Sequence, residues 1–287
     1  MTSDVGNHLE SYVLDEFDHA ARLLAGQSVG HGGIHGARKS IRRARAALRL
    51  ARKVLGDAAG DALDVSGEIG ANLASLRDAH VAVTTLSALA AQSAARDERE
   101  LLRRVGRVFA TRRSALYAES RARGTIAYYR GQLRDLRAAL ERLPWRKVTA
   151  HALREALDHD IRRAGRIGAR ADASADGDLR HRWRRRLRRL RYELKAAAQA
   201  LGRRPEVHST WSWPARRGNG RRCVSLAVRP EVLRGLTDRL GREHDLRMVY
   251  AALRALEALD RSDRNGARRI VRRAIAAACK PLDRGEG

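Results

Sequence analysis

The most constraining feature of this sequence is a basic pattern of helical spacing that occurs twice. In each copy a histidine is followed by basic residues at offsets of 3, 7, 10 and 14. At about 100° per residue, these five positions lie within an arc of roughly 80° on one helix face. The first copy, here called the first ladder, consists of His35, Arg38, Arg42, Arg45 and Arg49. The second ladder begins 146 residues later and consists of His181, Arg184, Arg188, Arg191 and Lys195.

Each ladder is accompanied by an apolar stripe in the same register. The matching positions of the two stripes, with the glycines that follow them, are Ile41 and Leu187, Leu48 and Leu194, Leu55 and Leu201, and Gly56 and Gly202. This match indicates an internal duplication. Like charges four residues apart destabilise a helix by roughly 0.2 to 0.5 kcal/mol per pair, so we expect an anion to offset the repulsion. The alternatives are a solvated arginine-rich face and the duplication of a plain scaffold.

The chain also lacks helix breakers over a long stretch. Its first proline is Pro144, so the first 143 residues contain none. Alanine, leucine and arginine recur there at helical spacing, without a run of alternating β-branched residues. This predicts an all-α fold. Periodicity and chain breakers place the helices at 7–26, 34–55, 58–91, 96–122, 125–142, 148–170, 178–201, 229–258 and 262–280.

A second pair of matching segments shows where the copies differ in length. The matching residues are Leu73, Arg77, Asp78 and Val81 in one segment and Leu240, His244, Asp245 and Met248 in the other. Their offset is 167 residues, so the second copy has 21 extra residues after its ladder, at about 203–224. The chain is thereby divided into a first helical half at 1–123, a connecting helix or linker at 124–147, and a second helical half at 148–287.

The insertion at 203–224 has the composition of a surface segment. It contains Trp211, Trp213 and Pro214, followed by the turn-like Gly218-Asn219-Gly220 among arginines. This composition indicates a loop or a short hairpin. A functional alternative is a basic flap over a bound anion.

The charge of the chain limits the class of partner. Lysine and arginine total 59 against 33 acidic residues, a formal net charge of +26. This balance favours a polyanion: nucleic acid, an anionic membrane surface or a phosphate polymer. Aromatic residues make up only 4% of the chain, and neither ladder has the interleaved aromatics on which bases stack, so a partner without bases fits better.

No run of 18 apolar residues and no signal-like N-terminus occur, and we expect a cytoplasmic protein that does not insert into a membrane.

We find no pattern typical of a catalytic or metal site. The acidic residues are scattered and the ladders contain none, whereas phosphoryl transfer uses carboxylates that converge on Mg²⁺. His31 and His35 have the spacing of a helical metal pair, but Gly32 and Gly33 separate them. No nucleotide-binding glycine-rich loop is present. We therefore expect no enzymatic activity, no cofactor and no metal.

Four motifs in order make the chain resemble the CHAD domain, a helical domain named for its histidines. They are His35-x-x-Arg38-x-x-x-Arg42-Arg43-x-Arg45, then Leu76-Arg77-Asp78, then His181-x-x-Arg184-x-x-x-Arg188-Arg189-Leu190-Arg191-Tyr192, and Leu240-Gly241-x-x-His244-Asp245. The resemblance implies two pseudo-symmetric four-helix bundles that face each other across a basic central cavity. It also implies binding of inorganic polyphosphate and association with polyphosphate granules.

The sequence thus predicts a non-enzymatic protein that binds inorganic polyphosphate through its two ladders. Arg77 and His244 are further candidates for the site. Asp78 and Asp245 are expected to hold an arginine in a fixed orientation where the following helix returns against the ladder helix. The alternatives are a helical nucleic-acid-binding protein and, with less support, a hydrolase of polyphosphate or triphosphate.

Overall fold

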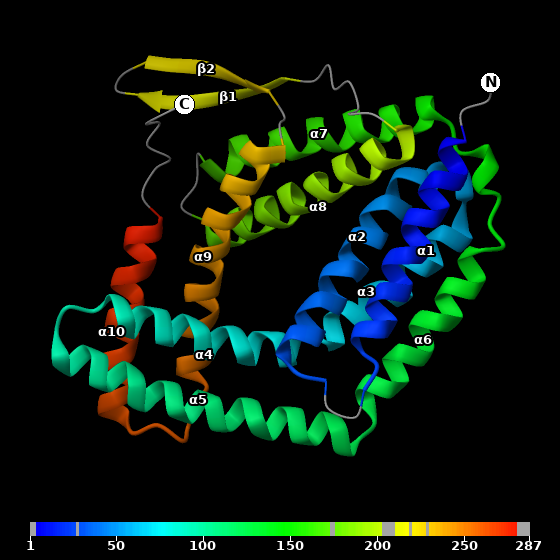
Figure 1. Ribbon diagram of the computed structural model, residues 1–287. Helices are drawn as coiled ribbons and strands as arrows, with labels where there is room; N and C mark the ends of the chain where they lie inside the picture. The colour runs from blue at the N-terminus through cyan, green and yellow to red at the C-terminus, as the bar shows by residue number, and fades with distance from the viewer. Residues whose placement is uncertain are drawn as a thin grey trace. The chain divides into compact units, whose positions relative to one another are not determined.

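The structure is a computed structural model (Figure 1) that describes residues 4–26, 29–172, 176–202, 210–217, 220–227 and 230–279. Within these ranges the elements are the helices α1 (Val5–Leu23), α2 (His31–Leu55), α3 (Asp57–Asn72), α4 (Ala74–Gln92), α5 (Arg96–Ala122), α6 (Thr125–Leu140), α7 (Ala150–Asp172), α8 (Gly177–Leu201), α9 (Pro230–Arg254) and α10 (Arg261–Ala278), the 3-10 turn η1 (Trp145–Lys147), and the strands β1 (Thr210–Arg217) and β2 (Gly220–Ala227). The prediction of a helical fold is confirmed.

One helix prediction is wrong, because the segment 58–91 forms two helices. The break lies at Leu73, whose ψ of −3° departs from the helical value although its amide still donates to the Ile69 carbonyl at 3.1 Å. No glycine or proline marks the position, and Leu73 is fully buried. The residues on either side, Asn72 and Ala74, therefore give no strong signal that a helix ends here.

The helices belong to two compact units that are interleaved along the chain. Unit 1 comprises Met1–Leu73 and Thr125–Thr237, and unit 2 comprises Ala74–Gly124 and Asp238–Gly287. Each unit takes helices from both predicted sequence halves. The units of packing and the halves of the repeat are therefore different divisions of the chain.

Unit 1 is built around α1, α2, α7 and α8, which pack against one another, while α6 packs against α1 and α3 (Figure 1). The predicted apolar stripes form part of its core, because Ile41, Leu48, Leu187 and Leu194 are at most 5% exposed. The glycines that follow the stripes end α2 and α8 at positive φ, 72° at Gly56 and 65° at Gly202. Gly202 has the left-handed conformation that commonly terminates a helix, and Gly56, with a ψ of −152°, has another positive-φ conformation that favours glycine.

The segment 124–147 belongs to unit 1 except for its first residue, Gly124, which belongs to unit 2. After α6, Trp145 is fully buried and its indole nitrogen donates to the Leu140 carbonyl at 2.7 Å. A Cβ added to Gly6 of α1 would lie 1.9 Å from the Trp145 carbonyl oxygen. The glycine therefore allows α1 to contact this backbone directly.

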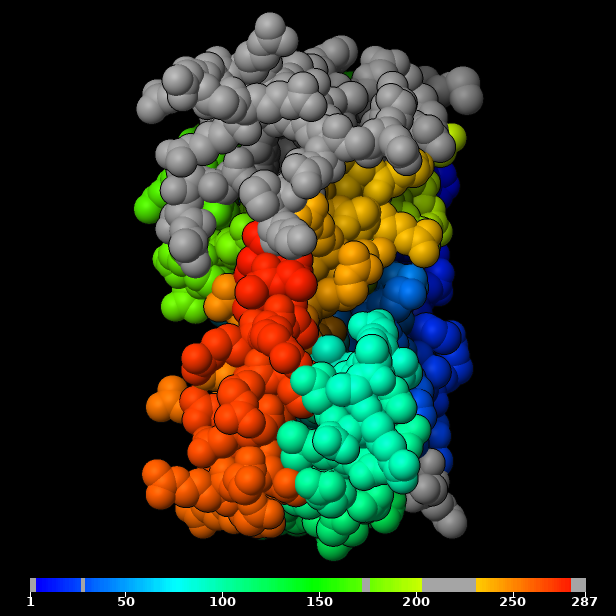
Figure 2. All heavy atoms as spheres, turned by 90° about the vertical axis from the view of Figure 1, so that its left-hand side faces the viewer, coloured from blue at the N-terminus to red at the C-terminus, as the bar shows by residue number. Residues whose placement is uncertain are grey.

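Unit 2 has its own apolar core, made by α4, α5, α9 and α10. Leu86, Phe109, Val249 and Val271 are among its buried residues. Figure 2 shows α10, in orange to red, lying beside α4 and the start of α5, in cyan. The ion pair of Arg104 with Asp263 joins α5 to α10, with two N–O distances of 2.7 and 3.1 Å.

The insertion contains an antiparallel hairpin, which confirms one of the two expected forms. Strands β1 and β2 pair with Thr210 opposite Ala227 and Arg217 opposite Gly220. Strand β1 lies against α7. The predicted turn residues Gly218 and Asn219 lie outside the described residues.

Candidate functional site

The fold brings the two ladders onto neighbouring helices. All ten ladder residues belong to unit 1, where α2 packs directly against α8. His35 and Lys195 are exposed, Arg184 is 9% exposed, and the other ladder side chains are partly buried. Two stretches 146 residues apart in sequence are therefore adjacent in the folded unit.

Part of the first ladder lies against glycines of α3. A Nη of Arg38 donates to the Gly70 carbonyl. The guanidinium of Arg45 lies where a Cβ on Gly67 would come within 2.8 Å of its Nη2. The absence of a side chain at Gly67 thus makes room for Arg45. The arginine spacing of α2 and the glycines of α3 together fix how these cations lie.

Cations of the two ladder helices lie close enough to perturb one another. Burial, and then the charges of Arg189 and Arg45, lower the pKa of Arg49 to about 10. Burial also lowers the pKa of Arg45, and Arg185 and Arg189 of α8 lower it further against the attraction of Asp64. The side with Arg45 and Arg49 therefore faces α8 positions that neighbour the second ladder. Sequence analysis missed Arg185 as a member of this group because it lies off the ladder spacing.

The second ladder opens on a half-buried histidine. Burial, followed by the charges of Arg185, Arg184 and Arg188, lowers the pKa of His181, with Asp178 acting in the opposite direction. The neutral imidazole is thus favoured and still carries one N–H donor. At the other end of the ladder, the Arg191 guanidinium lies 5.3 Å from the centre of the Tyr192 ring.

Acidic partners hold the arginine that follows the central ladder residue in each copy. In α2, Arg43 pairs with Glu16 of α1 at 3.2 Å. In α8, Arg189 lies 3.9 Å from Asp160 of α7, which also pairs with Arg186 at 3.1 Å. Arg43 and Arg189 are matched in the repeat, but their acidic partners are 144 residues apart and not 146. Because this offset is not 146, a comparison of the two copies at constant spacing does not pair Glu16 with Asp160.

The second copy also contains a fully buried carboxyl group. Glu193 is 0% exposed and lies 3.5 Å from the Nε of Arg189. Burial, and then the negative charge of Asp160, raise the pKa of Glu193 well above its usual range. Its protonated form is favoured, so it leaves most of the positive charge around it uncompensated.

In unit 2, the two expected aspartates pair with Arg77. Arg77 lies 3.0 Å from Asp78 and 3.5 Å from Asp245. Arg77 therefore meets the expectation of an arginine held by these carboxylates, and all three residues belong to unit 2. His244 lies partly buried on α9, one residue before Asp245.

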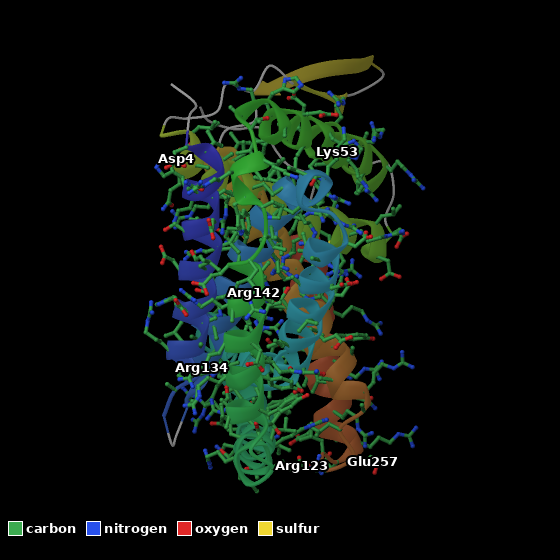
Figure 3. The ribbon with its side chains drawn as sticks, turned by 90° about the vertical axis from the view of Figure 1, so that its right-hand side faces the viewer. Asp4, Lys53, Arg123, Arg134, Arg142 and Glu257 are labelled. Carbon is green, nitrogen blue, oxygen red and sulfur yellow. The ribbon has the colours of Figure 1, made fainter. Side chains whose placement is uncertain are left out.

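A cleft of about 730 Å³ opens in unit 1 between the end of α2, α7 and α8. Its lining includes Arg49 of the first ladder and the matched positions Gly56 and Arg189, while Arg52, Arg162, Arg163 and Arg186 were not indicated by the repeat. Figure 3 labels Lys53 at this end of α2, where its ammonium group pairs with Glu155 of α7 at 3.0 Å.

Across the described residues, no three His, Cys, Asp or Glu side chains converge as metal ligands. No helix in the described ranges has the length and apolar character needed to cross a bilayer.

Comparisons with known proteins agree on the family. The CHAD domain model matches residues 12–211. The crystal structure of the CHAD domain from the plant Ricinus communis is similar over 99% of this chain and 90% of that one, with a TM-score of 0.65 and 19% identity. PptA from Streptomyces chartreusis is similar over 95% of both chains, with a TM-score of 0.61 and 16% identity. No curated protein sequence matches. With the fold and both histidine-led motifs in place, the chain belongs to the CHAD domain family.

Proposed function

We propose that this protein binds inorganic polyphosphate through the two ladders of unit 1 and does not transform it. The observation that carries the proposal is the direct packing of α2 against α8, which gathers both ladders in one unit. The resemblance to CHAD domains supports polyphosphate as the anion. The eight arginine and lysine residues of the ladders contribute to the net charge of +26, which also favours a polyanionic partner.

The electrostatics of the empty site favour a polyanion. Two unit charges about 6 Å apart repel by roughly 0.7 kcal/mol in water and by a few kcal/mol at an effective dielectric near 20. The lowered pKa values of Arg45 and Arg49 reflect such repulsion together with burial. A bound phosphate chain would replace repulsion by charge-assisted hydrogen bonds, which guanidinium groups make bidentately.

Polyphosphate fits the ladders better than nucleic acid does. Proteins that bind single-stranded nucleic acid stack its bases on aromatic rings, and each stacked base contributes roughly 1 to 3 kcal/mol to binding. No ladder residue is a phenylalanine, tyrosine or tryptophan, and Tyr192, which neighbours Arg191, is itself buried. RNA at matched charge concentration should therefore compete poorly for the site.

The chemistry of the ladders supports binding without turnover. A guanidinium group stays protonated at neutral pH and supplies neither a nucleophile nor a base. His35 and His181 are assigned as hydrogen-bond donors to phosphate oxygens. The alternative, hydrolysis, predicts release of orthophosphate from polyphosphate in the presence of Mg²⁺, which a phosphate assay measures.

Charge reversal in each ladder tests the binding site. Arg42→Glu and Arg188→Glu should each weaken polyphosphate binding strongly, and the double variant should lose less than the sum because the residues share one ligand. Arg166→Glu, an exposed position on α7, is the matched control. Full affinity in either ladder variant would refute joint binding by the two ladders.

The salt dependence of affinity reports the number of contacts. For single-stranded polyanions, log affinity falls with log salt by about 0.7 per neutralised charge, so eight ladder cations give a slope of about −5 to −6. A slope shallower than about −2 would contradict two cooperating ladders. In cells, we propose that the protein associates with polyphosphate granules, which a fluorescent fusion would reveal.

A further inference from the structure

The cleft between α2, α7 and α8 has features of a second site. Its volume of about 730 Å³ lies within the roughly 300–1,000 Å³ typical of small-molecule sites. Seven arginine or lysine side chains and three carboxylates line it, a surplus of four cations. Only Arg49 is shared with a ladder, so a different set of residues gives the cleft its charge.

The floor of the cleft is a preorganised group of cations. The side chains of Arg186 and Arg189 are 12% and 22% exposed, and Asp160 holds both. Arg49 lies beside them, with its pKa lowered to about 10 by burial and by Arg189. One carboxylate thus faces three guanidinium groups. Burial favours the protonated form of neighbouring Glu193, which leaves this excess in place.

The rim carries cations that no carboxylate engages. Arg52, Arg162 and Arg163 are exposed, and within the described part of the chain no ion pair involves them. Lys53 pairs with Glu155, but the two side chains are 80% and 54% exposed. An exposed pair of this kind contributes at most about 1 kcal/mol, so an entering anion can displace it.

The helix dipole does not account for this charge. The C-terminal end of α2 has a partial charge of roughly −0.5, which makes a basic residue or two favourable in its last turn. Arg52 and Lys53 fit that role. Arg162 and Arg163 come from within α7 and Arg186 and Arg189 from within α8, so most of the surplus needs another explanation.

The shape and lining of the cleft define the class of ligand. Among the described residues that line it there is no phenylalanine, tyrosine or tryptophan, so these residues offer no platform on which a nucleobase stacks. Guanidinium groups on three helices can reach several phosphates at once, each as a bidentate donor. A small frame that carries several phosphate groups matches both the charge and the volume.

We propose that this cleft is a second anion site, which binds a compact cluster of three or more phosphate groups. The ligand is either a short inorganic phosphate chain or a small organic polyphosphate without a base. Arg162 and Arg163 would contact it at the rim, and Arg186 and Arg189 at the floor. The assignment does not depend on binding of long polyphosphate by the ladders.

Calorimetric titration tests the site with tripolyphosphate in one arm and inositol hexakisphosphate in the other. Arg162→Gln with Arg163→Gln should weaken the tighter-bound of the two probes by about tenfold or more. Arg166→Gln with Arg170→Gln removes the same charge from exposed positions on α7 outside the cleft and should have little effect. Whichever probe binds better identifies the source of the phosphate cluster.

A variant that should bind the probe more tightly completes the test, because a folding defect could only weaken binding. Glu155→Gln removes an exposed carboxylate from the rim and should tighten probe binding by about two- to threefold. Arg42→Gln with Arg188→Gln should weaken long-chain polyphosphate but reduce probe affinity less than the cleft variant does. The proposal is overturned if neither probe binds, or if probe affinity follows the ladder variant and ignores the cleft variant. Failure of the ladders alone would leave probe binding intact.

Discussion

The two ladder helices carry the same pattern of charge in different surroundings. His181 is partly buried, whereas its counterpart His35 is exposed. Glu193 is a fully buried carboxyl group in α8, and the matching position of α2 is Ala47, which is equally buried. The repeat therefore determines which residues share a face. The neighbouring helices determine which of these polar side chains are buried from solvent.

The largest expected effect comes from the acidic partners of the two helices. Asp160→Asn removes the carboxylate that holds Arg186 and Arg189 and leaves both partly buried, so we expect a loss of about 3 kcal/mol in the free energy of unfolding. Glu16→Gln, the counterpart for Arg43, should cost about 1.5 kcal/mol because one hydrogen-bonded arginine is affected. Urea denaturation of both variants measures the difference. Equal losses would mean that the two surroundings are energetically equivalent.

The buried carboxyl group of α8 should make stability depend on pH, whereas the matching position of α2 has no titrating group. Because the pKa of Glu193 is raised in the folded protein, the folded state keeps a proton that the unfolded chain loses above about pH 4.5. The free energy of unfolding should then fall by about 1.4 kcal/mol per pH unit until the folded-state pKa is reached.

Glu193→Gln keeps the shape of the protonated group and should remove this contribution to the pH slope. Denaturation at several pH values between about 5 and 7.5 compares the parent and the variant. Ala47→Ser, at the matching position of α2, serves as a control without a titrating group. Parallel slopes in parent and Glu193→Gln would show that Glu193 is ionised in both states.

Neutral substitutions in the ladders should affect the two helices unequally. The Nε of Arg45 is buried without a hydrogen-bond partner among the described residues, and burial lowers its pKa. Arg45→Gln should therefore raise the melting temperature of the ligand-free protein by about 2 °C. Arg191→Gln should raise the melting temperature less, because it also removes the cation–π contact with Tyr192. A contact of this kind contributes about 0.5–1 kcal/mol. A lower melting temperature for Arg45→Gln would show that this arginine stabilises the fold.

The smallest effect concerns the histidines and the pH dependence of binding. Bound phosphate should raise the lowered pKa of His181, so that binding takes up a proton and polyphosphate affinity increases a few-fold as the pH falls from about 7.5 to 5.5. His181→Asn should flatten this dependence. His35→Asn should flatten it less, because His35 is exposed. Titrations in two buffers of different ionisation enthalpy would measure the proton uptake directly.

The periodic parts of this fold were predictable, and the contacts between elements were not. The faces of α2 and α8 and their terminal glycines follow from local spacing, which a sequence displays directly. The break at the buried Leu73 has no glycine or proline beside it that would predict it. Arg45 owes its position to Gly67, a residue 22 positions away on another helix.

The candidate site shows the same limit. The ladder residues were predictable because all of them obey one period. Asp160 and Glu193 were not, since neither repeats in the first copy at the offset of the ladders. Arg162 and Arg163 of the cleft belong to no repeated motif, and only the packing of α7 against α2 and α8 gives them a common environment.

The interleaving of the two units has a consequence for the order in which the chain is made. Helices α1 to α3 leave the ribosome before the whole of α4 and α5, and their partners α7 and α8 follow only after these unit 2 helices. Synthesis proceeds at roughly 5–20 residues per second, so α8 is made about ten seconds after α2. During this time the apolar face of α2 lacks α8 as a packing partner. A cut between the repeats, anywhere in 124–147, would leave each fragment with parts of both cores and with neither complete. Such fragments would have to find each other in solution before either core could close.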